Sequence, residues 1–416
     1  MTRLKVLHLA PQARVPDRMT RATFIDEEIR AVAAAGIEVF VLSAAIPADT
    51  HSGSVWLKSI PARRSLSNRL KASRLLVRPV AGLPVRNWTD PRHWYQCGWF
   101  EYIAAKVVLD EGIDLIHSHF AWPNGQGGMI ARAMTGRPLV AVFRGNDLLT
   151  SPEIGYGARR KPAFDRAVRG LLRTADRTIY FSDTMRRKAV ELGASPETAR
   201  LLHKGVNTER FFVAKDRTAL RQELGFGTRP MIMTVAGLIT RKGVHHILEA
   251  LARLRGSHDF TFVIVGQGPE RARLAELSGQ LGLQDKTVFM GRVDRQMIPK
   301  YFAACDLFVL ASLVDAAPNV ILEAMSAGRP VVTTASGGAG EFTKDGETGF
   351  VVPVADTGAL AARIQSLLSN PALCEQFGAE GRRRAVIEFS NGRMASDIID
   401  VYRDLMSEGP RNRVAV

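Results

Sequence analysis

The chain has 416 residues, enough for two domains with separate cores, and its 56 Lys and Arg against 41 Asp and Glu give a net charge of +15, which favours an anionic partner. Three widely spaced cysteines form neither a disulfide framework nor a metal-binding spacing, so we expect a reducing compartment. The apolar run near the N-terminus is too short for a signal peptide, and no run of about 20 apolar residues predicts a transmembrane helix.

Short apolar runs alternate with helical patterns along the chain. In the first half the pattern predicts strands at 5–10, 39–44, 115–120, 139–145 and 177–182. In the second half it predicts strands at 232–237, 261–266, 287–291, 307–312 and 330–334. Helical patterns such as 24–36 and 243–256 lie between them. This alternation is typical of parallel sheets with helices on both faces, so we predict an α/β protein with two doubly wound, Rossmann-like domains.

A strongly basic segment follows the first predicted strands. Residues 62–94 mix eight cations with Leu, Val and Trp side chains; the cations are Arg63, Arg64, Arg69, Lys71, Arg74, Arg78, Arg86 and Arg92. Such a mixture suits a segment that lies on an anionic membrane surface. The alternative is that the charge serves general solubility.

Polar side chains cluster at two later strands of the first half. His117 and His119 are two residues apart, so they lie on one face of a strand. A structural role ranks first for this pair, then a substrate contact, then a metal, because no third ligand with metal spacing is evident. Arg144 and Asp147 follow the next strand, at the edge of the sheet where ligands of such folds bind.

Lys242 precedes Gly243 at a predicted helix start, where a cation and free N–H groups would converge on an anion. The alternative is a solvated lysine in a surface turn. Glycine pairs in two further turns permit close approach of the backbone to a ligand; they are Gly266 with Gly268, and Gly337 with Gly338.

The most specific pattern is residues 315–332, DAAPNVILEAMSAGRPVV. Asp315 and Glu323 stand eight positions apart, and a helix is predicted to begin near Pro318 and to end at Gly328. Asp315 therefore falls in a loop and Glu323 on the first turns of a helix. A carboxylate beside a helix N-terminus suits sugar hydroxyls next to a phosphate, so we predict a bound sugar or ribose here.

This pattern resembles the E-x7-E signature of the family 4 retaining glycosyltransferases, which use nucleotide sugars and have the GT-B fold. Segments that resemble other parts of the same family are 23–39, 114–125, 137–147, 175–193, 261–311 and 333–353. The resemblance implies four parts of the chain. They are an acceptor-side domain at 1–206, a linker at 207–228, a nucleotide-sugar domain at 229–390, and a helix at 391–416 that crosses back to the first domain.

On the donor side, the resemblance implies that Lys242 grips the diphosphate, that Asp315 faces the donor sugar and that Glu323 holds the ribose. Gly237 stands where relatives carry an arginine, and Arg241 is a candidate substitute. Asp315 as a helix cap and Glu323 as a solvated residue are the structural alternatives. The predicted catalytic residues are Lys242, Asp315 and Glu323. The predicted donor-binding residues are Gly237, Arg241, Gly266, Gly268, Pro318, Asn319, Val320, Gly337 and Gly338.

On the acceptor side, many relatives carry a histidine where Arg144 stands. An arginine cannot shuttle protons at neutral pH but can bind phosphate with two hydrogen bonds. We therefore predict that His119, Arg144 and Asp147 contact the acceptor or the sugar. Three further arginines could meet an anionic acceptor or could simply be solvated; they are Arg14, Arg18 and Arg21.

The resulting prediction is a cytoplasmic retaining glycosyltransferase, peripheral on the inner face of the plasma membrane. It would move a sugar from a nucleotide diphosphate sugar to a glycan or lipid-linked acceptor in cell-envelope synthesis. No metal or other cofactor is predicted, because the chain shows no D-x-D motif at a strand end and a lysine can replace a cation. The alternatives are an epimerase or phosphorylase on the same fold, and a non-catalytic nucleotide-sugar-binding scaffold. Nucleic-acid binding has no recognised motif in its favour.

Overall fold

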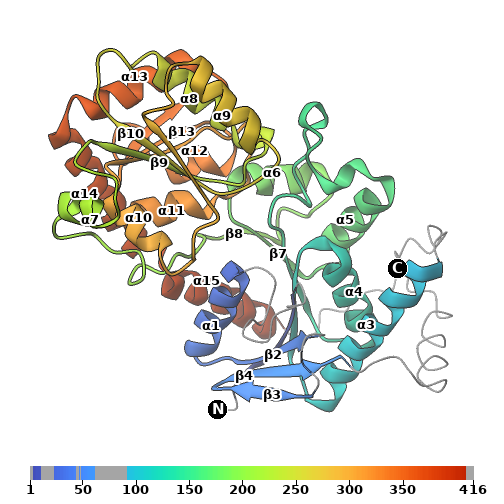
Figure 1. The fold of residues 1–416 in the computed structure, drawn as a ribbon. Coiled ribbons are helices and arrows are strands. Elements are labelled where there is room, and N and C mark those ends of the chain that lie inside the picture. Colours follow the sequence, from blue (N-terminus) through green and yellow to red (C-terminus); the bar gives the residue numbers. More distant parts are fainter. Residues whose placement is uncertain (1–2, 11–22, 44–45, 47, 61–90, 409–416) are drawn as a thin grey trace. The chain divides into compact units, whose positions relative to one another are not determined.

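A computed structural model describes residues 3–10, 23–43, 46, 48–60 and 91–408. The chain forms two compact units, each with its own sheet (Figure 1). The first unit comprises Met1–Leu202 together with Met394–Val416, and the second comprises His203–Arg393. The basic segment predicted at 62–94 lies almost wholly outside the described residues, as do Arg14, Arg18 and Arg21.

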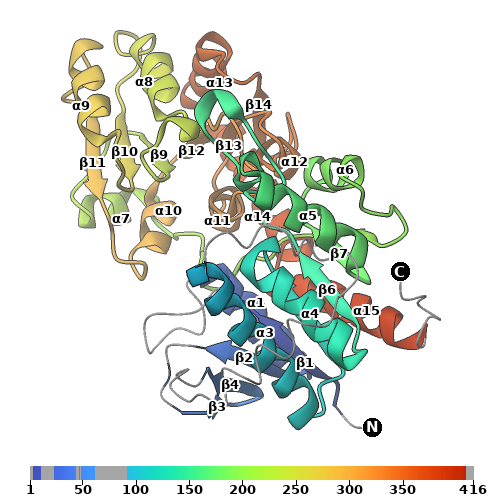
Figure 2. The same cartoon turned by 90° about the vertical axis from the view of Figure 1, so that its right-hand side faces the viewer.

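The first unit is built on an eight-stranded sheet with the order β3-β4-β2-β1-β5-β6-β7-β8. All neighbouring strands are parallel except β3 with β4 at one edge. The strands are β1 (Lys5–Leu9), β2 (Glu38–Ser43), β3 (Thr50–Ser52), β4 (Val55–Ser59), β5 (Leu115–His119), β6 (Leu139–Val142), β7 (Arg177–Tyr180) and β8 (Ala199–Leu201). The helices are α1 (Thr23–Ala34), α3 (Pro91–Asp110), α4 (Gln126–Thr135), α5 (Pro162–Thr174), α6 (Asp183–Glu191) and α15 (Asn391–Ser407). In Figures 1 and 2, α3 and α4 lie on one side of this sheet and α15 on the other.

The second unit holds a six-stranded parallel sheet with the order β11-β10-β9-β12-β13-β14. Its strands are β9 (Met231–Val235), β10 (Thr261–Val265), β11 (Thr287–Gly291), β12 (Leu307–Leu310), β13 (Val331–Thr334) and β14 (Gly349–Val352). Its helices are α7 (Arg217–Glu223), α8 (Val244–Ala252), α9 (Arg271–Gln280), α10 (Ile298–Ala304), α11 (Asn319–Ser326), α12 (Gly338–Phe342), α13 (Thr357–Leu368) and α14 (Pro371–Ile387). Figure 1 shows α8, α9 and α13 on one side of this sheet and α10, α11 and α14 on the other. The predicted doubly wound α/β class is therefore confirmed.

The central strands are buried because helices cover both of their faces. Every residue of β5, β6, β10, β12 and β13 is buried, which explains why these segments read as continuous apolar runs. β5 carries the most buried polar residues of these strands, since His117, Ser118 and His119 are all fully buried. Buried polar groups need partners, so β5 marks a site of special chemistry in the first unit.

Residues 207–228, predicted as a linker, lie within the second unit. They include α7, whose first turn is capped by Asp216. The buried Arg221 of α7 pairs with Asp306 at the start of β12 and donates to the carbonyl of Arg229 at 2.6 Å. The same carboxylate accepts the N–H of Met231 at 2.6 Å. This ion pair ties α7 to the sheet of the second unit.

The chain passes between the units at residues 202–203 and again at 393–394. The two passing segments are bonded to each other, because Val206 donates its N–H to Phe389 O at 2.7 Å and Asn391 donates to Val206 O at 3.1 Å. From Met394 onward α15 belongs to the first unit, three residues later than the predicted boundary at 391. Its buried residues include Ile398, Tyr402 and Leu405.

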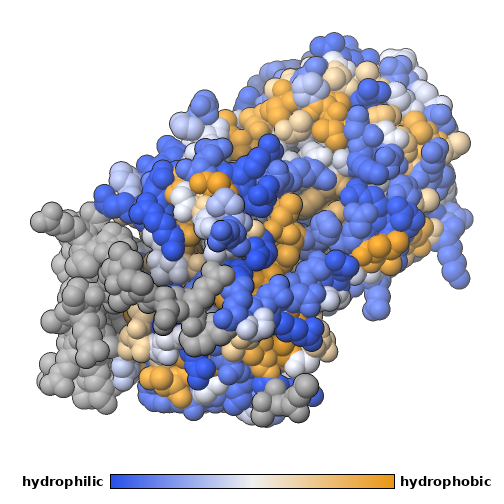
Figure 3. All heavy atoms as spheres, turned by 180° about the vertical axis from the view of Figure 1, so that it is seen from behind, coloured by the Kyte–Doolittle hydropathy of each residue, from blue (hydrophilic) through white to orange (hydrophobic). Residues whose placement is uncertain are grey.

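The face of the molecule seen in Figure 3 carries both hydrophilic and hydrophobic side chains. Figure 3 shows hydrophilic side chains over most of the visible face, with separate hydrophobic patches between them. Among the residues that the structure describes, no helix has both the length and the apolar character needed to cross a membrane.

Candidate functional site

The predicted signature forms a loop and a helix at the carboxyl end of β12. Asp315 lies in the loop and is only 8% exposed, and α11 begins four residues later at Asn319. Pro318 precedes the helix and gives no side-chain cap. Asp315 is therefore not a cap of α11. Its backbone instead pairs with the turn after β13, with Asp315 N donating to Ser336 O at 3.2 Å and Gly338 N donating to Asp315 O at 3.1 Å.

The side chain of Asp315 is bound by cations from the turn after β9. Lys242 Nζ donates to Asp315 Oδ2, and Ser312 Oγ donates to the same oxygen at 3.1 Å. Arg241 Nη1 lies 3.9 Å from this oxygen and donates to Val314 O at 2.7 Å. Lys242 is thus a partly buried partner of Asp315, and the solvated-lysine interpretation is wrong. Two cations and one carboxylate leave the cluster with an excess of positive charge.

Close backbone contacts make these turns possible. A Cβ atom at Gly243 would lie 1.9 Å from Ala311 O, and one at Gly338 would lie 2.0 Å from Ala316 O. Side chains at Gly266 and Gly268 would meet Ala236 O and Leu238 O at 1.8 and 2.2 Å. These four glycines are therefore required by the packing of turn on turn, whatever ligand binds there. Gly237 differs, because a Cβ there would have nothing within 4 Å.

The first turn of α11 offers further polar groups. Asn319, Val320 and Glu323 are half-buried, and Pro318 is buried. Within the described residues, Asn319 Oδ1 is buried and has no hydrogen-bond partner. This atom is free to accept a hydrogen bond, and donor contact by Asn319 stays a prediction.

One residue of this site had no signal in the sequence. Lys204 follows β8, is 8% exposed and donates from Nζ to Ala317 O at 2.6 Å. Three cations therefore contact the loop after β12. Arg241 binds Val314, Lys242 binds Asp315 and Lys204 binds Ala317. A single lysine in a connecting segment shows neither periodicity nor a motif, so only the fold reveals its place.

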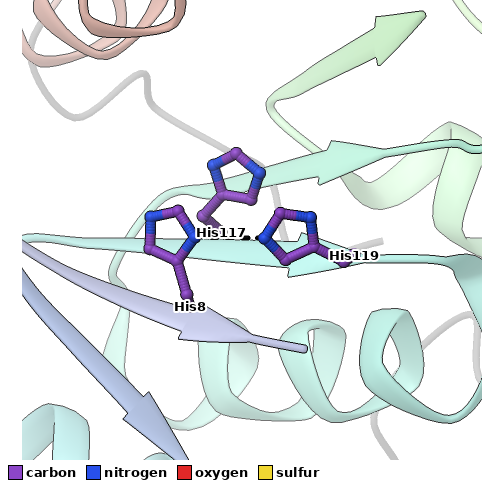
Figure 4. Close-up of side chains that lie close together, drawn as sticks. All are labelled: His8, His117 and His119. Atoms are coloured by element: carbon purple, nitrogen blue, oxygen red, sulfur yellow. Dashed lines mark hydrogen bonds between the residues drawn. The ribbon is translucent and has the colours of Figure 1, made fainter. Parts of the chain in front are cut away.

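The first unit contains a buried cluster of three histidines on neighbouring strands (Figure 4). His8 comes from β1, and His117 and His119 come from β5, which pairs with β1. All three are fully buried. Glu28 of α1, Arg144 after β6 and Tyr402 of α15 complete the cluster. His8, Glu28 and Tyr402 were not predicted, because they lie far from β5 in the chain.

Arg144 sets the direction of the hydrogen bonds in this cluster. Its Nη2 donates to His119 Nδ1 at 2.9 Å, so His119 carries its proton on Nε2 and donates to His8 Nδ1 at 3.1 Å. His8 Nε2 then donates to the Tyr402 hydroxyl at 3.4 Å, and that hydroxyl donates to His117 Nδ1 at 2.5 Å. His117 Nε2 faces Glu28 Oε1 at 3.7 Å, and Glu28 Oε2 accepts from Arg144 at 2.6 Å. Six side chains therefore form an almost closed ring.

Burial keeps the three imidazoles neutral. It lowers the pKa of His8 to about 3, with a smaller contribution from the positive charge of Arg144. The pKa values of His117 and His119 are also well below the ordinary value, mainly because of burial and then because of neighbouring histidines and Arg144. Glu28 accordingly pairs with Arg144 and not with an imidazolium.

Nitrogen atoms of the three histidines lie within 4.8 Å of one another, so the cluster must be tested as a metal site. A metal lies in the plane of each imidazole that binds it. The His8 and His117 rings are stacked with centroids 4.4 Å apart and planes inclined by 14°, so one ion cannot lie in both planes. Arg144 also occupies the Nδ1 lone pair of His119 with a positive charge. The arrangement suits a hydrogen-bond network and not a three-histidine metal site.

The three predicted acceptor contacts are all engaged within the protein. Asp147 is 2% exposed, and it accepts the N–H groups of Arg144 at 3.1 Å, Gly145 at 2.9 Å and Ala121 at 3.3 Å. It thereby ties the turns after β5 and β6 together. The Arg144 side chain is 4% exposed and lies over the rings of Phe24 and Phe181. Acceptor contact by His119, Arg144 and Asp147 stays a prediction.

The neutral histidines predict acid-sensitive stability. Their folded pKa values are below the unfolded value of about 6.5, so their contribution is present above pH 6.5 and is lost as the pH falls through 6.5 towards the folded values. For His8, whose folded pKa is about 3, we expect a cost of about 2 kcal/mol of unfolding free energy between pH 7.5 and pH 5, and His117 and His119 act in the same direction. Glu101, whose pKa burial raises to about 7, acts in the opposite sense and offsets part of this.

Chemical denaturation across this pH range measures the effect. His8→Gln removes one titrating group and should reduce the slope of unfolding free energy against pH. The same substitution at the exposed His51 is the matched control for the chemistry of the change. An unchanged slope in His8→Gln would contradict the assignment of a neutral, buried His8.

Comparison with known proteins identifies the family. Residues 22–210 match the family Glycosyltransferase Family 4, and residues 216–384 match Glycosyl transferases group 1. A GDP-mannose-dependent alpha-(1-6)-phosphatidylinositol monomannoside mannosyltransferase of Mycolicibacterium smegmatis is 30% identical over 68% of this chain and 74% of its own length. N-acetyl-alpha-D-glucosaminyl L-malate synthase of Bacillus anthracis is 24% identical over 74% of this chain and 80% of its own length.

Solved structures show the same fold. Sucrose-phosphate synthase from Thermosynechococcus elongatus superposes with a TM-score of 0.77 at 21% identity, covering 98% of this chain and 100% of its own. Anabaena HepE in complex with UDP and glucose gives a TM-score of 0.71 at 22% identity, covering 96% of this chain and 100% of its own. The chain therefore belongs to glycosyltransferase family 4, and it is a glycosyltransferase with the GT-B fold.

Proposed function

We propose that this glycosyltransferase takes its sugar from a nucleotide diphosphate sugar, retains the anomeric configuration, and delivers the sugar to a lipid-linked or polysaccharide acceptor of the cell envelope. The observation that carries the donor assignment is the cluster of Lys242, Arg241 and Asp315 beside the first turn of α11. Cations and helix N–H groups at the carboxyl ends of parallel strands suit a diphosphate.

In the proposed reaction the bond between the anomeric carbon and the diphosphate oxygen breaks. Negative charge develops on the departing diphosphate, and Lys242 together with the N–H groups at the start of α11 stabilises it. Without donor, Asp315 balances the charge of Lys242. With donor, Lys242 turns to the diphosphate and Asp315 is released to accept sugar hydroxyls. The acceptor hydroxyl attacks from the face that the diphosphate leaves, its proton passes to the leaving phosphate oxygen, and Glu323 holds the ribose.

The acceptor class is supported by the relatives. One acts on a phosphatidylinositol monomannoside, and a second, 33% identical over 44% of this chain, is named as a lipopolysaccharide core biosynthesis glycosyltransferase of Rhizobium meliloti. Both names pair a sugar with a lipid, which supports a lipid-linked acceptor. The first relative uses GDP-mannose, whereas the HepE structures hold UDP or UDP-glucose, so the base of the donor is to be determined by experiment.

Changing Lys242 to Ala tests the donor site. Loss of the cation should weaken the binding of the donor diphosphate and the stabilisation of the departing diphosphate in the transition state. The donor KM should therefore rise, and kcat should fall, by roughly tenfold or more each. The assay is a screen of UDP-, GDP-, ADP- and dTDP-sugars by thermal shift, followed by NMR of the transfer product, which also reads the anomeric configuration. Glu323→Ala should likewise abolish detectable transfer.

The exposed Lys344, which pairs with Glu347, supplies the control variant Lys344→Ala. It should transfer sugar at the wild-type rate. Unchanged donor KM and kcat in Lys242→Ala would refute the proposed diphosphate site.

We further propose that transfer needs no metal ion, because Lys242 and Arg241 supply the positive charge that a divalent cation supplies elsewhere. Purified protein dialysed against EDTA should keep its full rate. A rate that falls in EDTA and returns with added Mg²⁺ or Mn²⁺ would overturn this proposal and leave the donor assignment intact.

We also propose that the protein acts at the cytoplasmic face of the plasma membrane, held by residues 62–94. Each Lys or Arg near an anionic surface contributes about 1 kcal/mol of attraction, and salt screens it. The protein should therefore co-sediment with phosphatidylglycerol vesicles at low salt and much less at high salt. Changing Arg63, Arg64, Arg69, Lys71 and Arg74 to Gln should weaken sedimentation and spare nucleotide binding. Equal sedimentation with neutral phosphatidylcholine vesicles would contradict the proposal.

A further inference from the structure

We propose that Lys204 is a positioning residue for the transfer reaction. It holds the carbonyl of Ala317 and thereby fixes the loop that carries Asp315 and leads into α11. This inference rests on the proposed donor site and adds to it a residue outside the family signature.

The position of Lys204 requires an explanation because lysines are almost never buried without a partner. Lys204 lies at the start of the second unit, and its Nζ is 2.6 Å from Ala317 O in a buried contact. Ala317 precedes Pro318, and the peptide bond between them has no N–H group. The carbonyl of Ala317 is therefore the only hydrogen-bonding group of that peptide, and Lys204 is its buried donor.

The place of this carbonyl matters for an anion. It belongs to the peptide that joins Ala317 to the N-cap residue Pro318, one peptide ahead of Asn319, where the N–H groups of the helix N-terminus would face the donor diphosphate. A carbonyl oxygen turned towards that site would repel a phosphate. An ammonium group that holds the oxygen to itself keeps the negative end of the dipole away from the anion and adds positive charge nearby.

The three cations of the loop have different tasks. Arg241 holds Val314 O at 2.7 Å, Lys242 holds the carboxylate of Asp315, and Lys204 holds Ala317 O. Lys242 donates directly to the carboxylate of Asp315 and can exchange it for a phosphate, whereas Arg241 lies 3.9 Å from the same oxygen. Arg241 and Lys204 grip neutral backbone oxygens on either side, so they keep the loop in place while Lys242 changes partner.

Lys204 can serve as an anchor because its own segment is braced. Two residues later, Val206 donates to Phe389 O at 2.7 Å and accepts from Asn391 at 3.1 Å. These bonds tie the segment to the residues that precede the body of α15. The ammonium group is therefore presented from a fixed backbone, as a positioning role requires.

The test compares Lys204→Met, Lys204→Gln and Lys204→Arg in the full-length protein. Methionine keeps the linear side chain and removes the donor, so the donor KM and the Kd for UDP, GDP and inorganic pyrophosphate should rise about tenfold, the usual effect of losing a hydrogen bond from a charged group. The acceptor KM should stay unchanged. Arginine should restore donor binding largely, and glutamine in part, because both still offer an N–H donor.

Several outcomes decide the matter. A purely structural lysine would lower the active fraction, so kcat would fall while both KM values stayed at the wild-type level, and that result would overturn the proposal. Equal pyrophosphate affinity in Met and wild type would do the same. If Lys204→Met does not fold, the difference between Gln and Arg in donor KM carries the test, and identical values at the wild-type level refute it.

The control for removing an ammonium group is Lys344→Met, a change at an exposed lysine far from this loop in the chain. Failure of this inference can also be distinguished from failure of the proposed function. If Lys242→Ala loses donor binding while Lys204→Met retains it, only this inference fails. If the wild-type protein binds none of the nucleotides or nucleotide sugars, the proposed function fails first.

Discussion

The proposed donor site depends on one ion pair, the contact between Lys242 and Asp315. Asp315 is nearly buried, and a buried carboxylate is tolerated only when cations and hydrogen-bond donors surround it. The requirement explains why the turns after β9, β12 and β13 meet so closely. Their meeting in turn requires glycine at positions 243 and 338, where any side chain would collide with a backbone carbonyl. In the reaction that we propose, a diphosphate takes the place of Asp315 as the partner of Lys242.

In the first unit the buried polar side chains find their partners in a different way. They bond to one another in an almost closed ring through Arg144, His119, His8, Tyr402, His117 and Glu28. Within the described residues, His117 Nε2, Glu28 Oε1 and Arg144 Nε have no hydrogen-bond partner. Arg144 is the cation that makes the ring directional and neutralises Glu28. Tyr402 makes the ring depend on α15, the helix that follows the second unit in the chain. The turns after β5 and β6 are therefore held by side chains that sequence patterns assign to separate elements.

Much of the fold could be predicted because it follows from periodicity. The apolar runs at 261–266 and 307–312 became β10 and β12, and the pattern of Pro318 and Gly328 placed α11 within a residue or two. The linker was harder to place, because α7 is short and is fixed to the second unit by the pairing of Arg221 with Asp306 across 85 residues. The acceptor or sugar contact predicted for His119, Arg144 and Asp147 stays a prediction, and the burial of these residues among protein partners could not be predicted from alternation along one strand.

The sequence by itself determined the class of the fold, the family and the candidate donor residues, because these depend on local spacing: eight positions from Asp315 to Glu323, and a Lys-Gly step before a helix. Only the tertiary structure decided which groups meet. Lys204 reaches Ala317 across 113 residues, and Tyr402 reaches His117 across 285. Contacts at such separations are set by how helices and strands stack, and no pattern within either segment records them. Spacing along the chain therefore predicts which elements form, whereas the partners of buried charges emerge only when those elements pack.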